Sequence, residues 1–270
     1  MAENQINNKS LSIRVCSNGL SFCTYAPGQK APFEYKVWEV NHTISLAANL
    51  KEALMNEPIL KQDYQRVTVL TTPPHFTTVP VAAFQNEDIH AVYQFTFPKD
   101  KPQHVSYNVL RRAGIAIVFG LERSIHQLLL DDFPRARFYA SASTLIESFS
   151  EKSLFGSGKK MFVYLHEKEI TLYAFEQGRM LFVNNYECVS VADIQYYTLN
   201  VWKELGFDQV DDALFVVGDM EKRTTDLSEK IKYFLQNVSV IDRGEDFKDR
   251  LTMGNPFIPY DLQTLLICGF

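Results

Sequence analysis

The sequence predicts an α/β protein with mixed sheets, built from two halves of the same design. Residues 11–40 and 160–188 each contain three runs typical of β-strands, joined by short connections. In each half an amphipathic helix and then an apolar strand follow. Three meandering strands followed by a helical crossover imply a mixed sheet with helices packed against it. With 46% hydrophobic and 13% aromatic residues, the chain can fill a core in both halves.

The first half starts with alternating apolar and polar residues over 11–16. Asn18-Gly19 follows, and this dipeptide between two such runs predicts a hairpin, because both residues tolerate a positive φ. We expect the remaining strands of this half at 20–25, 33–40 and 66–72. A helix over 42–57 precedes the last of them, with Pro58 just beyond its end.

The second half repeats this order. We expect strands over 160–166, 169–175 and 179–188, joined by two-residue turns at Glu167-Lys168 and Gln177-Gly178. Ser190 and Asp193 predict a capping box for the next helix, which Gly206 ends. The sequence then predicts a strand over 213–218, a helix over 228–237 and a strand over 238–242.

These elements divide the chain into residues 1–158 and residues 159–270, with an inserted subdomain at about 73–131. The insertion contains "YQFTF", where Tyr93, Phe95 and Phe97 alternate with polar residues. In a strand these rings share one face, which predicts core packing or, if the face is exposed, a partner site.

Composition and charge exclude several classes of function. Twenty-seven basic and 32 acidic residues give a net charge of −5, which argues against nucleic-acid binding. We see no signal peptide and no apolar run long enough to span a membrane, so we expect a cytoplasmic protein without direct membrane insertion. The four cysteines lack metal-site spacing and are expected to be free thiols, although Cys16 and Cys23 flank a hairpin and could face each other.

The duplicated strand-strand-strand-helix-strand order resembles the actin-like ATPase superfamily in its ribonuclease H-like arrangement. The second half, "FVYLHEKEITLYAFEQGRMLFVNNYECVSVADIQYYTLNVWKELGFD" and then "ALFVVGD", is similar to the actin-like proteins of type IV pilus assembly. The whole chain also resembles a bacterial family of uncharacterised proteins with this fold. The resemblance implies two phosphate-binding loops, one in each half, and a double glycine near the adenosine.

The chain departs from this pattern at each of these positions. The first phosphate-loop position offers Ser17 and Asn18 and no carboxylate, and the second offers His166 and Glu167 and no glycine. Only Gly218 remains of the double glycine. Glycines let backbone N–H groups approach a phosphate, and a carboxylate organises the metal, so these substitutions predict loss of ATP binding. A two-residue hairpin turn also leaves no concave nest of free N–H groups.

We therefore expect a non-catalytic interaction or scaffold module with a protein partner, no catalytic residues, no cofactor and no metal. One alternative is an ATP-binding or ATP-hydrolysing enzyme with atypical loops, in which Asp193, Asp219 or Glu167 supplies the metal-binding and base roles. A second alternative is a small-ligand sensor that uses the cleft between the halves.

Three further patterns carry weaker chemical signals. "GSGKK" at 156–160 lacks the first glycine and the Ser or Thr of a phosphate-binding loop, and we read it as a linker. His166, Glu167 and Glu169 are the nearest to a metal set, but we expect a solvated turn. The acidic run at 208–212 is expected to be a charged loop.

Overall fold

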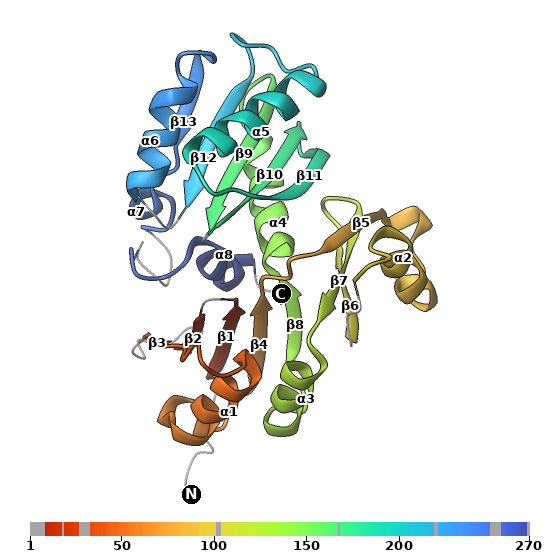
Figure 1. The fold of residues 1–270 in the computed structure, drawn as a ribbon, viewed down its shortest axis with the longest axis vertical. Helices are drawn as coiled ribbons and strands as arrows, with labels where there is room; N and C mark the ends of the chain where they lie inside the picture. The colour runs from red at the N-terminus through yellow and green to blue at the C-terminus, as the bar shows by residue number, and fades with distance from the viewer. Residues whose placement is uncertain are drawn as a thin grey trace, which may run out of the picture. The chain divides into compact units, whose positions relative to one another are not determined.

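The structure, a computed structural model, describes residues 9–17, 19–26, 33–100, 104–166, 168–218, 221–248 and 255–268 (Figure 1). The chain forms two compact units. The first comprises Met1–Val109 and Ile115–Ser143, and the second comprises Leu110–Gly114 and Thr144–Phe270. Sequence analysis placed the division at 158/159, whereas most of helix α4 (Ser141–Ser153) groups with the second unit.

The first unit contains a five-stranded mixed sheet of order β3-β2-β1-β4-β8. Its strands are β1 (Ser10–Cys16), β2 (Gly19–Tyr25), β3 (Glu34–Trp38), β4 (Arg66–Thr71) and β8 (Arg137–Ala140). The central strand β1 runs antiparallel to β2 and parallel to β4, and β8 extends the sheet parallel to β4. Helix α1 (Leu46–Asn56) and the short helix η1 (Pro58–Lys61) connect β3 to β4, as the crossover pattern predicted.

The second unit repeats this sheet with the order β11-β10-β9-β12-β13. Its strands are β9 (Lys159–His166), β10 (Glu169–Glu176), β11 (Arg179–Glu187), β12 (Ala213–Gly218) and β13 (Asn237–Val240). Strand β9 takes the central place, antiparallel to β10 and parallel to β12. The predicted duplication of the strand-strand-strand-helix-strand order is therefore confirmed, and the two sheets also share the spatial order and the directions of their strands.

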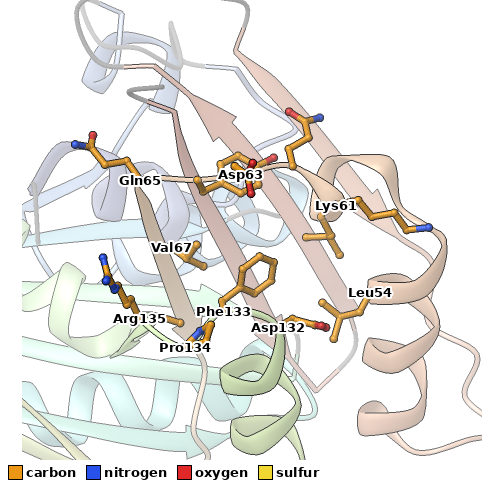
Figure 2. Close-up of a pocket in the computed structure, with 13 residues that line it drawn as sticks. Leu54, Lys61, Asp63, Gln65, Val67, Asp132, Phe133, Pro134 and Arg135 are labelled. Atoms are coloured by element: carbon orange, nitrogen blue, oxygen red, sulfur yellow. The ribbon is translucent and has the colours of Figure 1, made fainter. Parts of the chain in front are cut away.

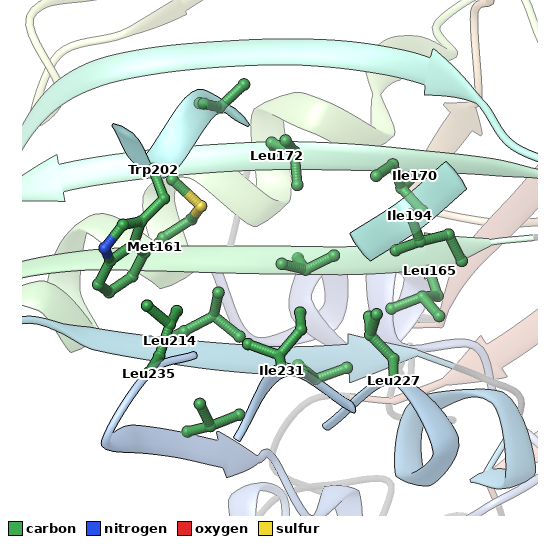
Figure 3. Close-up of a cluster of buried hydrophobic side chains, with 14 of the residues drawn as sticks. Met161, Leu165, Ile170, Leu172, Ile194, Trp202, Leu214, Leu227, Ile231 and Leu235 are labelled. Atoms are coloured by element: carbon green, nitrogen blue, oxygen red, sulfur yellow. The ribbon is translucent and has the colours of Figure 1, made fainter. Parts of the chain in front are cut away.

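Helices cover both faces of the second sheet. On one face, α5 (Val191–Glu204) and α6 (Glu221–Ile231) bury Ile194, Trp202, Leu227 and Ile231 against alternate residues of the central strands (Figure 3). The intervening residues of β9 point to the other face, where aromatic rings dominate. There Phe149 of α4 stacks on Phe162 with 4.4 Å between ring centroids, and Tyr260 of α8 (Tyr260–Cys268) lies 6.4 Å from Tyr164. The short helix α7 (Arg243–Asp246) follows β13.

Local signals set the ends of α5. Ser190 accepts a hydrogen bond from the Asp193 N–H, and the Asp193 carboxylate accepts one from the Ser190 N–H, so the predicted capping box is present. At the other end Gly206 takes a positive φ of 63°, a conformation in which glycine carries no steric cost.

One face of the first sheet is apolar and packs against two helices. Residues of β1, β2 and β4 pack against Leu50 and Ala53 of α1 and against Ile125 and Leu129 of α3 (Arg123–Asp132). Because α3 belongs to this core, the insertion does not extend to residue 131 as the sequence prediction placed it.

The insertion forms a separate three-stranded sheet of order β5-β7-β6. It comprises β5 (Phe76–Pro80), η2 (Val81–Ala83), η3 (Asn86–Asp88), α2 (Ile89–Thr96), β6 (His104–Leu110) and β7 (Ile115–Leu121). Its core joins Tyr93, Val105 and Val118.

Two elements differ from the sequence prediction. The "YQFTF" segment lies at the end of α2 rather than in a strand: Tyr93 and Phe97, four residues apart, pack together in the core, while Phe95 is 90% exposed. Helix α6 begins seven residues before the predicted start at 228 and ends at Ile231, where a turn lets Leu235 enter the core before β13. Short apolar runs are compatible with both the helical and the strand periodicity, and tertiary packing decides which of the two structures forms.

Side chains of β6 fix the insertion to the edge of the first sheet. Buried Asn108 donates to the Phe138 carbonyl (2.8 Å) and accepts from the Ala140 N–H (2.9 Å) and the Ser143 hydroxyl (2.7 Å). Nearby, the imidazoles of His104 on β6 and His126 on α3 stack with centroids 3.7 Å apart, and His126 also packs on Phe138. Burial lowers the pKa of both histidines, and for His104 the neighbouring His126, His90 and Arg123 lower it further.

We predict that Asn108→Ala lowers the free energy of unfolding by about 2–4 kcal/mol, because it leaves a buried carbonyl and a buried N–H without partners. Urea denaturation measures this change. Asn86→Ala, at an exposed position, is the control and should change stability by less than about 0.5 kcal/mol. Equal effects of the two substitutions would contradict the role given to Asn108.

The histidine pair predicts a pH dependence of stability. Because folding lowers both pKa values below the ordinary 6.5, the pair stabilises the fold above that pH, and the contribution is lost as the pH falls. The melting temperature should therefore drop between about pH 7.5 and about pH 5.5, and His126→Gln should flatten this dependence. His42→Gln, at an exposed loop position, should leave the slope unchanged; the same flattening in both variants would argue against the stacked pair.

Candidate functional site

The phosphate-loop positions lie at the carboxyl ends of the central strands, and both connections are short. Cys16 of β1 pairs with Gly19 of β2, and His166 of β9 pairs with Glu169 of β10. Two residues separate the members of each pair. Gly19 already belongs to β2 and has no left-handed backbone, so it is not a turn residue as the Asn-Gly signal predicted.

Of the predicted site residues, the structure describes Ser17, His166 and Gly218. Asn18 and Glu167 lie outside the described residues, as does Asp219. Ser17 is exposed at the end of β1, in the first unit. His166 and Gly218 lie close together in the second unit, because Gly218 pairs with Leu165, the residue before His166.

His166 is part of a packed polar cluster. Its ring is 6% exposed and stacks on Tyr164 with 5.2 Å between centroids. Its Nε2 lies 3.3 Å from the Thr171 hydroxyl and 4.0 Å from a Glu169 carboxylate oxygen. The Thr171 hydroxyl in turn donates to the Asn185 amide oxygen at 2.7 Å. These contacts hold the imidazole within the hairpin rather than in an open site.

Gly218 is closely surrounded at the end of β12. A Cβ atom there would lie 3.0 Å from Leu165 Cβ, from the Leu165 carbonyl oxygen and from Thr224 Cγ2. Real Cβ contacts are rarely this close, so a larger residue here would push Leu165 or Thr224 away by a few tenths of an ångström, and glycine favours the close packing of β12 against β9 and α6. This constraint explains the glycine without any ligand.

Beside Gly218 lies a cavity of about 500 Å³ that sequence analysis did not single out. Thr224, Asp242, Arg243 and Pro256 contribute to its lining. It opens at the carboxyl ends of β12 and β13, the edge at which open α/β sheets generally bind ligands. Asp242 caps α7 by accepting from the Gly244 N–H at 2.8 Å, so its carboxylate is partly engaged. No sequence motif marks this cavity, because its residues come from three separated segments.

The first unit contains a cavity of about 580 Å³ at the opposite edge of its sheet. It lies near the amino ends of β4 and β8, and its lining includes Phe133 and the charged residues Lys61, Asp63, Asp132 and Arg135 (Figure 2). Two acidic and two basic side chains give it no net charge. Its place is remote from the carboxyl ends that carry the phosphate-loop positions of the same sheet.

The other polar candidates have structural partners. Asp193 serves the α5 cap, and the hydrogen bond from the Ser190 N–H lowers its carboxyl pKa. Asp208 accepts from the N–H groups of Asp211 and Val210, which lower its pKa, and Asp212 accepts from the Lys159 N–H at 2.6 Å. The acidic run is thus a hydrogen-bonded loop.

The "GSGKK" segment is also accounted for by packing. Gly156 and Gly158 both adopt a positive φ. The Lys159 ammonium donates to the Gly206 carbonyl at 2.6 Å, and the Lys160 ammonium donates to the Ser153 carbonyl at 3.1 Å. Neither lysine is presented as a phosphate ligand.

The described residues contain no group of three or more His, Cys, Asp or Glu side chains placed to hold a metal ion. Cys16, Cys23 and Cys188 are buried and form no disulfide, and Cys23 pairs across the hairpin with Ser12 rather than with Cys16. The facing pair considered from the sequence is therefore absent. Throughout the described part of the chain, no helix is both long enough and apolar enough to cross a bilayer.

The duplicated sheets, with their shared strand order, define an actin-like ATPase fold. A Bacteroides thetaiotaomicron protein described as having the actin-like ATPase fold and unknown function is 33% identical, with a TM-score of 0.84 over 97% of this chain and 96% of that one. The chain belongs to the family described as "Protein of unknown function (DUF3822)", whose pattern matches residues 1–238.

A more distant structure shares the fold. The PilM–PilN type IV pilus biogenesis complex superposes with a TM-score of 0.53 at 9% identity, over 87% of this chain and 89% of that one. EutJ, an ethanolamine utilization protein from Carboxydothermus hydrogenoformans, gives a TM-score of 0.46 at 10% identity over 86% and 84%. Comparison with curated proteins gives no match.

The packing at Gly218 makes a testable prediction. Gly218→Ala should lower the free energy of unfolding by about 1–3 kcal/mol, because the new methyl group overpacks the contact with Leu165 and Thr224. Gly19→Ala is a matched control: its Cβ would meet only Cys16 Sγ, at 3.9 Å. Chemical denaturation compares the two. A Gly218→Ala protein as stable as the wild type would show that the contact is looser than described.

Proposed function

We propose that this protein is a nucleotide-independent member of the actin-like fold that acts by binding another protein. The observation that carries the proposal is the closure of both central hairpins, at Cys16–Gly19 and His166–Glu169. Strand pairing to the last residue leaves no wide loop at the places where actin-like ATPases hold phosphates.

The energetic consequence is large. Each charge-assisted hydrogen bond from a backbone amide to a phosphate contributes roughly 1.5–3 kcal/mol. Missing several such bonds on both sides lowers affinity by several orders of magnitude. The crowding at Gly218 by Leu165 and Thr224 supports the same conclusion for the adenosine position.

Exposed aromatic side chains support a protein partner. Tyr233 and Phe234, in the turn after α6, are 87% and 49% exposed, and Val210 on a neighbouring loop is 58% exposed. Asn237, at the start of β13, donates to the Val210 carbonyl at 2.6 Å, which places the two loops together. Aromatic residues are enriched at protein interfaces. The structural likeness to the PilM of a PilM–PilN complex is consistent with a partner-binding role, although fold alone carries weak functional weight.

The direct test is calorimetric titration of the full chain with Mg-ATP. We expect no saturable heat up to about millimolar nucleotide, which corresponds to less than about 4 kcal/mol of binding free energy. Phosphate release should stay at the buffer background in the same samples. Micromolar affinity would overturn the proposal and favour an ATP-binding protein with atypical loops.

Two further measurements separate the alternatives. If phosphate release exceeds background, Glu167→Gln tests the carboxylate that the sequence favours for a metal or base role. If the titration detects no Mg-ATP binding, a thermal-shift screen with nucleotides, sugars and metal ions tests for a small-ligand sensor. The variant Arg243→Ala shows whether a ligand found in this way binds in the cavity beside Gly218. A ligand that raises the melting temperature of the wild type but not of Arg243→Ala would replace the interaction proposal.

A further inference from the structure

A groove in the second unit lies beside α4. It consists of a cavity of about 590 Å³ and an adjoining cavity of about 380 Å³, whose linings share Gln177 and Arg179. The lining of the larger cavity comes from the turn between β6 and β7, from one side of α4 and from the turn between β10 and β11. All of these segments belong to the second unit. We call this feature the α4 groove.

Hydrogen bonds fix one wall of the α4 groove. Gln177 and Gly178 take positive φ angles of 47° and 83°, as in the two-residue turns that close β-hairpins. The Ser150 hydroxyl donates to the Gly178 carbonyl at 2.7 Å, and the Gly178 N–H donates to the Ser153 hydroxyl at 2.9 Å. A Cβ atom at Gly178 would lie 2.8 Å from Leu154 Cδ2, so the turn and the end of α4 are in close contact. A wall held in this way does not have to be ordered when a ligand binds.

The charges of the α4 groove are unbalanced. The two linings carry three carboxylates and two guanidinium groups, an excess of one negative charge. Glu147 and Glu151 lie one turn apart on α4, a spacing at which like charges repel. Burial raises the pKa of the Glu147 carboxyl, Arg112 lowers it, and Glu151 raises it again. Arg179 already makes an ion pair with Glu176 at 3.1 Å. The pair of carboxylates on α4 therefore favours a further cation.

The same side of the helix ends in apolar residues. Leu154 follows the last residue of α4, lines the larger cavity and is 60% exposed, and the next residue, Phe155, is 73% exposed. Glu147, Glu151 and Leu154 recur at i, i+4 and i+7, which places them on one face of a helix. Along the α4 groove, an acidic pair is thus followed by an exposed apolar end.

We propose that the α4 groove binds an extended peptide segment of another protein, in which a Lys or Arg is followed two residues later by an apolar residue. The basic side chain lies between Glu147 and Glu151, and the apolar side chain covers Leu154. The inference rests on the protein-binding role proposed above and gives the chemistry of the partner. It uses a different surface from the one that contains Tyr233 and Phe234.

The spacing along α4 selects this pattern. The midpoint of Glu147 and Glu151 lies five residues before Leu154, which is about 7.5 Å at the helical rise per residue. Side chains on one face of an extended chain recur every two residues, about 6.6–6.8 Å apart. A basic residue gains contacts to both carboxylates and relieves their repulsion, whereas an acidic residue at the same place would add to it.

Selection from a phage-displayed library of random heptapeptides, against the full chain, tests the pattern. We expect enriched peptides to share Lys or Arg followed at the second position by an apolar residue. Glu151→Lys should remove the preference for a basic residue, and Leu154→Ser should remove the apolar preference alone. Glu204→Lys, at an exposed position of α5, is the matched control and should select the same peptides as the wild type.

A synthetic peptide of the enriched sequence then measures the effect by fluorescence anisotropy. We expect Glu151→Lys to raise its Kd about tenfold or more, and Glu204→Lys to change it less than about twofold. A library without the pattern, or a peptide with equal affinity for the wild type and Glu151→Lys, would overturn the proposal. Basic peptides without an apolar preference would also overturn it, because they would indicate a site for small cations.

The same peptides separate this inference from the general protein-binding role. Peptides whose binding is lost in Tyr233→Ser but kept in Glu151→Lys would show that partners use the other surface. The inference about the α4 groove would then fail alone, while the protein-binding role would stand.

Discussion

Each half of this protein is organised by a central strand that is hydrogen-bonded on both sides. Strands β1 and β9 are antiparallel to a hairpin partner and parallel to a crossover strand. A parallel partner cannot be reached by a tight turn, so a helix must intervene. Both central strands are buried on both faces. This burial explains the continuous apolar run of β9 and the helices that cover the second sheet on each side.

The same pairing determines which of the sequence-predicted site positions lie close together. Because the parallel strands of a half end at one edge, the hairpin turn and the end of the crossover strand meet there. In the second unit this brings His166 beside Gly218. Each of these two residues is closely packed: His166 contacts Thr171 and Tyr164, and Gly218 contacts Leu165 and Thr224.

The sequence predicted the features that depend on neighbouring residues. The alternation over β1, the apolar run of β9, the short connections and the capping box of Ser190 and Asp193 are all local, and the structure confirms the elements that they predict. The sequence alone could not predict that Tyr93 lies in a helix with Phe97 at its C-terminal cap, because a short aromatic run fits both the helical and the strand period until its core partners are known. Nor could it find Asn108, whose three partners lie about 30 residues away in the chain. Gly218 was singled out as a vestige of a double glycine, but the reason for a glycine there is visible only in its packing.

The central claim, that the two hairpins are closed to a triphosphate, is tested most directly by a crystal structure determined in excess Mg-nucleotide. The account predicts that the Cys16–Gly19 and His166–Glu169 pairs persist and that no phosphate is bound at either turn. Phosphate oxygens held by the amides of opened turns at these two positions would contradict it.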